Sequence, residues 1–242
     1  MGVKFEFLIK INKDATDLLI LGSGSYDPNK MSPPIFQRHT WIDDFKETVI
    51  FYNDPTLYLD KITIGWGQGS EDRHYLYEQS HILEVLIKKM KFQREQVYFY
   101  GSSAGGFMSL MLAGFIRGTT AIVNNPQTLV MNFWPSPVRD MLNASYPNLS
   151  REEVEDRFLC RINVVEFYKK IGYVPPIYYL QNVSAKRDVD SHLIPFIEGL
   201  KDLSDELFSS QLNLKLYANE EQGHSPVNKK ETLTFISTVI KG

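Results

Sequence analysis

The sequence predicts an α/β fold, with one mostly parallel sheet that carries helices on both faces. Short β-rich runs alternate with amphipathic helical patterns along most of the chain, which is typical of this class. With 242 residues the chain can bury one large core, and its 43% hydrophobic and 13% aromatic content excludes disordered and fibrous proteins. We therefore expect residues 1–242 to form a single domain.

Seven β-rich runs mark the expected strands. The first two are joined by the short polar segment NKDAT, which predicts an antiparallel hairpin at an edge of the sheet. Helical patterns separate the later runs, so those strands should pair in parallel. The runs are residues 4–11, 17–23, 47–53, 96–101, 119–125, 175–182 and 212–219.

Helices are expected where apolar residues recur on one face. Three such runs cover residues 74–91, 104–115 and 232–240. Residues 126–174 interrupt the simple alternation with several prolines and with a capped helix that begins at Ser150, followed three residues later by a glutamate. We expect this insertion to form a helical lid over the carboxyl edge of the sheet.

Charge and composition exclude several kinds of partner. The formal net charge of -3 gives no broad attraction to nucleic acid, and no apolar run reaches the roughly 20 residues that cross a bilayer. Cys160 is the only cysteine and the five histidines lack metal-site spacing, so neither a disulfide nor a metal site is predicted, and a cytoplasmic location is expected. Gly22 and Gly24 are followed by Asp27 and by no helix, which excludes a dinucleotide fingerprint; we expect no cofactor.

The stretch QVYFYGSSAGGFMSL places Ser103 in a G-x-S-x-G motif. A predicted strand ends immediately before the motif and an amphipathic helix begins immediately after it, which is the context that supports a nucleophile. A strained turn leaves no room for bulky neighbours of the serine, and Gly101 and Gly105 have no side chain. The sequence therefore predicts that Ser103 is an exposed nucleophile at the carboxyl edge of the sheet.

A serine hydroxyl needs a base and a residue that orients the base. Two histidines follow Ser103, and His224 lies in a loop between the last predicted strand and the last predicted helix, whereas His192 begins a helical stretch and should pack locally. The loop after the preceding strand offers Asp188 and Asp190 as the acid. Asp188 is preferred because it lies nearer the strand end, and Asp190 stays open.

An oxyanion needs hydrogen-bond donors near the serine. The backbone N–H of Ala104 is expected to be one donor, and the loop LGSGSYD after an early strand should supply another from Ser23 or Gly24. Trp66, in the glycine-rich segment GWGQG, is a candidate for lining the substrate pocket.

The ordered series of the GSSAGG elbow, VNNPQ after the next strand, an aspartate after the following strand and QGH before the last helix resembles the α/β-hydrolase superfamily over most of the chain. The elbow followed by NNPQ is similar to hydrolase-fold proteins of bacterial capsule and surface-polysaccharide gene clusters, including capsule O-acetyltransferases. This resemblance implies an α/β-hydrolase fold, a triad of Ser103, Asp188 and His224, and positions near the pocket for Asn125 and Gln127.

These observations together predict a serine-dependent acyl-ester hydrolase or O-acetyltransferase with an acyl-serine intermediate. The resemblance implies a glycan substrate, a bacterial surface polysaccharide or its precursor, and an acyl donor such as acetyl-CoA as a partner. Two alternatives stay open: a carboxylesterase for small or lipid esters, and a catalytically idle hydrolase fold that binds glycans or acts as a scaffold. The motif does not separate hydrolysis from transfer.

Overall fold

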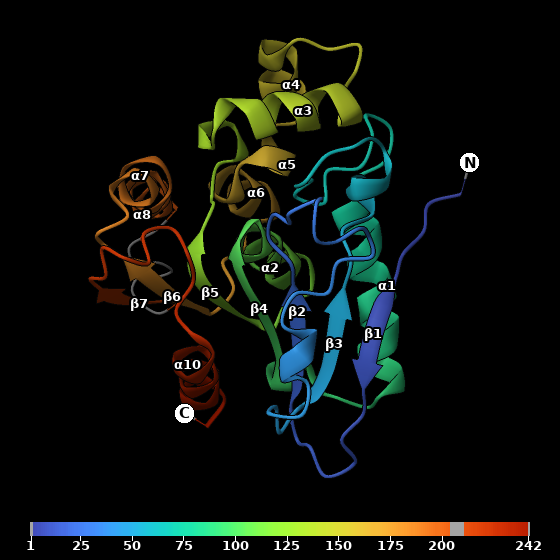
Figure 1. The fold of residues 1–242 in the computed structure, drawn as a ribbon, viewed down its shortest axis with the longest axis vertical. Helices are drawn as coiled ribbons and strands as arrows, with labels where there is room; N and C mark the ends of the chain where they lie inside the picture. The colour runs from blue at the N-terminus through green and yellow to red at the C-terminus, as the bar shows by residue number, and fades with distance from the viewer. Residues whose placement is uncertain (1, 204–210, 242) are drawn as a thin grey trace.

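The computed structural model describes residues 2–203 and 211–241. Within these ranges the strands form one sheet in the order β1-β3-β2-β4-β5-β6-β7, with helices on both sides of it (Figure 1). The mixed α/β class with a mostly parallel sheet is confirmed. The strands are β1 (Phe7–Lys10), β2 (Leu18–Gly22), β3 (Thr48–Tyr52), β4 (Val97–Ser103), β5 (Thr120–Pro126), β6 (Ile177–Asn182) and β7 (Leu212–Tyr217).

The predicted hairpin of the first two strands is wrong. β1 does lie antiparallel at the sheet edge, but its partner is β3, with Phe7 opposite Tyr52, while β2 lies inside the sheet and pairs in parallel with both β3 and β4. Every residue of β2 is buried. The apolar run LLILG needs cover on both faces, which an interior strand has and an edge hairpin lacks.

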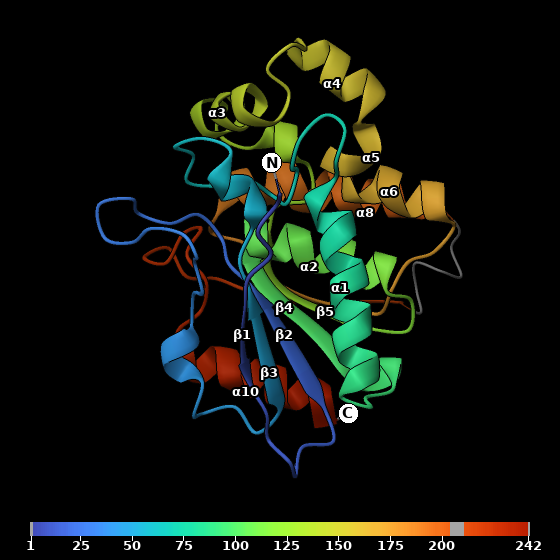
Figure 2. The same ribbon diagram turned by 90° about the vertical axis from the view of Figure 1, so that its right-hand side faces the viewer.

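Side chains of β2 alternate between two hydrophobic clusters, one on each face of the sheet. Leu18 and Ile20 belong to the cluster that includes α1 (Tyr75–Lys89) and α2 (Ala104–Phe115). Leu19 and Leu21 belong to the cluster that includes α10 (Lys229–Lys241), which covers the opposite face (Figure 2). The period of two along the strand thus produces a three-layer arrangement of helix, sheet and helix.

The segment at residues 126–174 contains α3 (Pro135–Ser145), α4 (Arg151–Arg157), α5 (Leu159–Ile162) and α6 (Val164–Ile171). Its last helix, α6, packs on α2, where the Tyr168 hydroxyl donates to the Leu110 carbonyl oxygen at 2.9 Å. α3 and α4 lie beyond the carboxyl ends of the parallel strands (Figure 1).

The capped start predicted for the helix at Ser150 is confirmed. The Ser150 hydroxyl accepts the backbone N–H of Glu153 at 3.2 Å, and the Glu153 carboxylate accepts the backbone N–H of Ser150 at 2.7 Å. Two amide groups at the helix N-terminus are thereby satisfied without tertiary contacts, which fixes where α4 begins.

Neither a membrane-spanning helix nor a cluster of metal ligands is found in the part of the chain that the structure describes. Each helix there is either too short or too polar to span a bilayer. No three histidine, cysteine, aspartate or glutamate side chains in the same ranges are gathered as metal ligands would be.

Candidate active site

The predicted elbow lies where β4 meets α2. Ser103 is the last residue of β4, with φ of 55° and ψ of -124°, and α2 begins at the next residue. A β-carbon added to Gly101 would lie 2.1 Å from the carbonyl oxygen of Gly105, and one added to Gly105 would lie 2.7 Å from that of Gly22. Glycine at both positions therefore lets the strand, the helix and the β2 loop approach closely enough to form this sharp turn.

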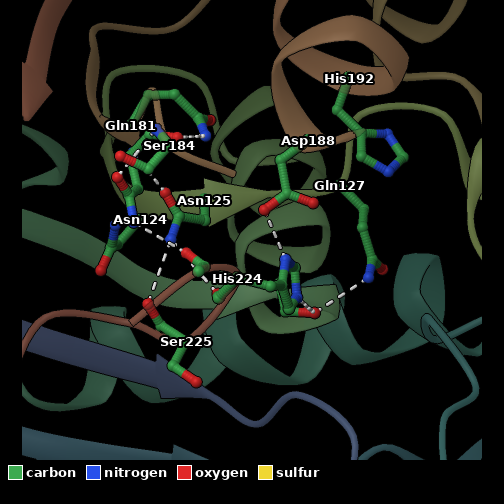
Figure 3. A network of polar contacts seen from close by, with 12 residues as sticks. Asn124, Asn125, Gln127, Gln181, Ser184, Asp188, His192, His224 and Ser225 are labelled. Carbon is green, nitrogen blue, oxygen red and sulfur yellow. Dashed lines mark hydrogen bonds and ion pairs between the residues drawn. The ribbon is translucent and has the colours of Figure 1, made fainter. Parts of the chain in front are cut away.

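Three predicted side chains meet above the elbow. Ser103 Oγ lies 2.9 Å from Nε2 of His224, and Nδ1 of His224 lies 2.6 Å from Oδ2 of Asp188. Figure 3 shows the dashed contact between the imidazole of His224 and the carboxylate of Asp188. Asp188 is buried whereas the His224 side chain is 41% exposed, so the carboxylate is shielded from solvent and the imidazole is accessible. This order matches the hydrogen-bonding pattern of a serine nucleophile, its base and an orienting acid.

The two candidate aspartates occupy different environments. Asp188 is the last residue of α7 (Lys186–Asp188), which follows the carboxyl end of β6. Asp190 is exposed and lies in the following π-helical turn, Val189–Leu193, and within the described residues no hydrogen bond or ion pair connects it to His224.

Replacing Asp188 with asparagine is therefore expected to lower turnover by about 10⁴-fold, because an amide in place of the carboxylate favours the wrong imidazole tautomer. Asp190→Asn should change turnover less than about twofold. Single-turnover acylation rates of the two variants test the ranking, and a larger loss at Asp190 would contradict the assignment.

His192 lies close to the site but is bonded away from Ser103. Its side chain is 1% exposed, its Nδ1 accepts the backbone N–H of Thr128 at 3.4 Å, and its carbonyl oxygen accepts the Thr128 hydroxyl at 2.7 Å. Burial lowers the pKa of His192 to about 4, despite the opposing effect of Asp188. The ring is therefore neutral near pH 7 and serves packing, as the sequence predicted.

Buried asparagines at the ends of β5 and β6 hold the loop that carries His224. The Asn125 amide donates to the carbonyl oxygens of His224 and Ser225, both at 3.2 Å. Asn182 donates to the carbonyl oxygens of Asn219 and Gly223 at 2.6 and 2.9 Å. Figure 3 shows the dashed contact that joins Asn125 to Ser225 of this loop. We call Asn124, Asn125 and Asn182 the asparagine clamp; Asn124 joins it by accepting the N–H of Val227 at 2.8 Å.

The predicted oxyanion donors lie beside the elbow. Ala104 is the first residue of α2, where helix N–H groups have no partner within the helix. A β-carbon added to Gly24 would lie 3.6 Å from Cβ of Ser103, but the Gly24 N–H already donates to Oε1 of Gln37 at 3.0 Å. The Ser23 hydroxyl donates to the Ile35 carbonyl oxygen. Gly24 could therefore serve an oxyanion only after the Gln37 amide turns away.

Trp66 and Gln127, both expected near the pocket, form a second series of hydrogen bonds that ends at Ser103. Nε2 of Gln127 lies 2.9 Å from Ser103 Oγ, and the indole N–H of Trp66 bonds Oε1 of Gln127. Both side chains are fully buried. The sequence indicated proximity for these two residues but contained no signal for a direct bond between Gln127 and Ser103.

A cavity of about 10 Å³ lies between the β2 loop and the start of α2. It adjoins the expected oxyanion donors and reaches the indole of Trp66. Space on this scale accommodates about one water-sized group. The residues lining it are Ser23, Gly24, Asp54, Leu57, Ile64, Gly65, Trp66, Ala104 and Met108.

No specific role for Asn124 or Asn182 was predicted from the sequence. Both asparagines stand at the carboxyl ends of predicted strands, where polar residues in an otherwise apolar run are a recognisable signal. Their partners, however, are backbone groups of a loop far along the chain. The binding partners of the two asparagines therefore become evident only from the folded structure, in which the ends of β5 and β6 lie next to the loop that carries His224.

No protein-family model matches the chain, and no curated protein matches it. Solved structures do. The capsule O-acetyltransferase of Neisseria meningitidis serogroup A superposes with a TM-score of 0.69 at 16% identity, over 98% of this chain and 92% of that chain. A histidine-to-alanine mutant of that transferase in complex with CoA gives 0.67 at 14% identity, over 98% and 91% of the two chains.

A second kind of enzyme is also similar in structure. Acetyl xylan esterase 1 from a Thermoanaerobacterium species gives a TM-score of 0.60 at 13% identity, over 98% of this chain and 78% of that chain. Similarity at such identities establishes the fold. The chain has the α/β-hydrolase fold that the elbow predicted, and the solved structures similar to it include a capsule O-acetyltransferase.

Proposed function

We propose that the protein is a serine enzyme that hydrolyses or transfers a short acyl ester through an acyl-Ser103 intermediate. The observation that carries the proposal is the continuous hydrogen-bonded chain from Ser103 through His224 to buried Asp188. Such an arrangement supplies a nucleophile, a base within hydrogen-bonding reach, and a carboxylate that fixes the tautomer of the base.

In the acylation step, His224 Nε2 takes the Ser103 hydroxyl proton while Oγ attacks the ester carbonyl carbon. The carbonyl electron pair moves onto its oxygen, next to the start of α2, where the Ala104 N–H is expected to donate to it. Collapse of the tetrahedral intermediate breaks the bond to the leaving oxygen or sulfur, which takes the proton from His224. Water or a sugar hydroxyl then attacks the acyl-serine with His224 again as base.

The size of the cavity beside the elbow favours an acetyl group. Its lining is largely apolar, and Met108 of α2, a residue that is 1% exposed, contributes to it. A methyl group fits space for about one water-sized group, whereas a longer acyl chain must displace side chains of a packed core.

We expect the wild type to prefer p-nitrophenyl acetate over the butyrate, and Met108→Ala to raise the butyrate-to-acetate ratio of kcat/KM by about 10-fold, the scale of one or two methylene groups in a pocket. Met111→Ala is the matched control, because Met111 is also buried in α2 but does not line the cavity. A wild type that accepts both esters equally would contradict an acetyl-sized pocket.

The acceptor that we propose is a bacterial surface polysaccharide or its precursor, with acetyl-CoA as a donor. Two comparisons support this: one relative is a capsule O-acetyltransferase whose mutant form is known in complex with CoA, and another is an acetyl xylan esterase. By name, the first transfers an O-acetyl group to a capsule and the second is an esterase for acetyl xylan. Because fold alone does not dictate substrate, the acceptor rests on this analogy.

Intact mass spectrometry tests the proposal without knowledge of the natural substrate. The protein is treated with a fluorophosphonate, which reports an activated serine, and separately with acetyl-CoA. One fluorophosphonate adduct on Ser103 is expected, and an acetyl adduct on the same residue would identify the donor. A folded sample with no fluorophosphonate adduct would overturn the serine mechanism and favour a binding role for the fold.

A further inference from the structure

We infer that Gln127 is a further catalytic residue, whose side-chain amide stabilises negative charge on Ser103 Oγ, and that Trp66 holds this amide in its donating orientation. The inference rests on the proposed serine mechanism and deepens it. Its starting observation is the 2.9 Å contact between Gln127 Nε2 and Ser103 Oγ, the same oxygen that His224 Nε2 contacts.

The orientation of the amide follows from the chemistry of its second partner. The indole N–H of Trp66 can only donate, so the group of Gln127 that it contacts must be the carbonyl oxygen. The NH₂ group is then left facing Ser103 Oγ as a donor. The flipped amide would place two donors against each other at Trp66 and an acceptor against the serine oxygen.

The amide has little freedom to leave this position. Gln127 and Trp66 are both fully buried, and the backbone N–H of Gln127 also donates to the Ser103 carbonyl oxygen at 3.2 Å. Trp66 packs edge-on against Phe133, with ring centroids 5.7 Å apart. A preorganised donor in a site shielded from water is worth more than one that must reorient when charge develops.

The charge that needs this donor appears twice in the reaction. When His224 removes the proton, Oγ gains negative charge as it attacks the ester; when the acyl-serine breaks down, Oγ gains it again as the leaving oxygen. Gly24 in the β2 loop has its N–H committed to Gln37, so it does not compensate for loss of the Gln127 amide. Gln127 therefore acts at the nucleophile, a different oxygen from the one that the Ala104 N–H is expected to serve.

Two substitutions at Gln127 separate a catalytic donor from a structural amide. Gln127→Glu keeps the acceptor for the Trp66 indole but replaces the donor with a carboxylate facing Oγ. Gln127→Met removes both polar groups at similar length and leaves the Trp66 N–H without its partner. A purely structural role predicts that Glu is tolerated better than Met, because an unsatisfied buried donor destabilises the fold. A donor to developing negative charge predicts the reverse order for the rate.

The readout is the second-order rate constant for fluorophosphonate labelling of Ser103 at about pH 8.5, where a carboxylate is ionised. Gln127→Met should label about 10²-fold more slowly than the wild type, the usual loss for one such donor, and Gln127→Glu more slowly still.

Gln79→Met is the matched control, because Gln79 is an equally buried glutamine whose amide donates to the carbonyl oxygen of Asn53 instead. Melting temperatures confirm that each variant is folded; if Gln127→Met fails to fold, Gln127→Glu, which keeps the Trp66 contact, decides.

A double-mutant cycle tests the role of Trp66. Trp66→Phe should slow labelling about 10-fold in the wild type and have no further effect in Gln127→Met, since the indole N–H acts only through the amide. Wild-type rates in both Gln127 variants would overturn the inference while leaving the serine mechanism intact. Absence of labelling in the wild type itself would overturn the mechanism instead.

Discussion

Ser103→Ala is expected to abolish fluorophosphonate labelling and to lower ester turnover by about 10⁵-fold or more, because no other group at the elbow can form the acyl intermediate. The fold should survive. Ser103 adopts a positive φ of 55°, and alanine carries the same β-carbon, so the substitution adds no backbone strain. Intact mass and melting temperature of the variant check both parts.

The control for this variant is Ser102→Ala, the preceding residue of β4, whose hydroxyl accepts from Arg38 at 2.8 Å. It should keep the labelling rate of the wild type within a few-fold. Equal labelling of Ser103→Ala and the wild type would show that the probe reacts elsewhere and would contradict the assignment of the nucleophile.

His224→Ala is expected to lower turnover, whereas His192→Ala is expected to lower stability. His224→Ala should lower turnover by about 10⁴-fold or more with little change in melting temperature, because its ring is bonded to Ser103 and is 41% exposed. His192→Ala should leave turnover within a few-fold but lower the free energy of unfolding by about 1–3 kcal/mol, because it removes a buried ring that satisfies the N–H of Thr128.

Acylation rate and thermal denaturation, measured on the same two samples, test this pair. Similar rate losses at both histidines would undo the assignment of His224 as base. A stable but inactive His192→Ala would also contradict the assignment, since it would give the buried histidine a catalytic role that its contacts do not indicate.

The chain of Ser103, His224 and Asp188 was predictable because each link has a local signal. The elbow needs small residues around a serine between a strand and a helix, and the base and acid must stand on loops after later strands, in that order. Parallel strands bring all such loops to one edge of the sheet, so their distance along the sequence does not matter. The choice between Asp188 and Asp190 required the structure, because two residues of helical turn change where a carboxylate points.

The pairing of β1 and the contacts of Gln127 were not predictable in the same way. The hairpin was predicted because strands that are neighbours in sequence often pair with each other. The fully apolar sequence of β2 is instead typical of an interior strand, which is buried on both faces. The Gln127 amide depends on the placement of Trp66, which adopts a φ of 51° in a loop from a distant part of the chain. Such a contact arises from tertiary packing and has no short-range pattern.

The asparagine clamp binds the loop that carries His224 through backbone groups. Asn125 and Asn182 donate to loop carbonyl oxygens, and the loop N–H groups that the clamp accepts belong to Asn219 and Val227. Glu220 and Glu221 are exposed and take no part in this anchoring. The loop can therefore exchange these two side chains, and with them the charge on its surface, while the imidazole stays in register with the serine. The surface charge of this short loop and the position of its imidazole are therefore separable properties.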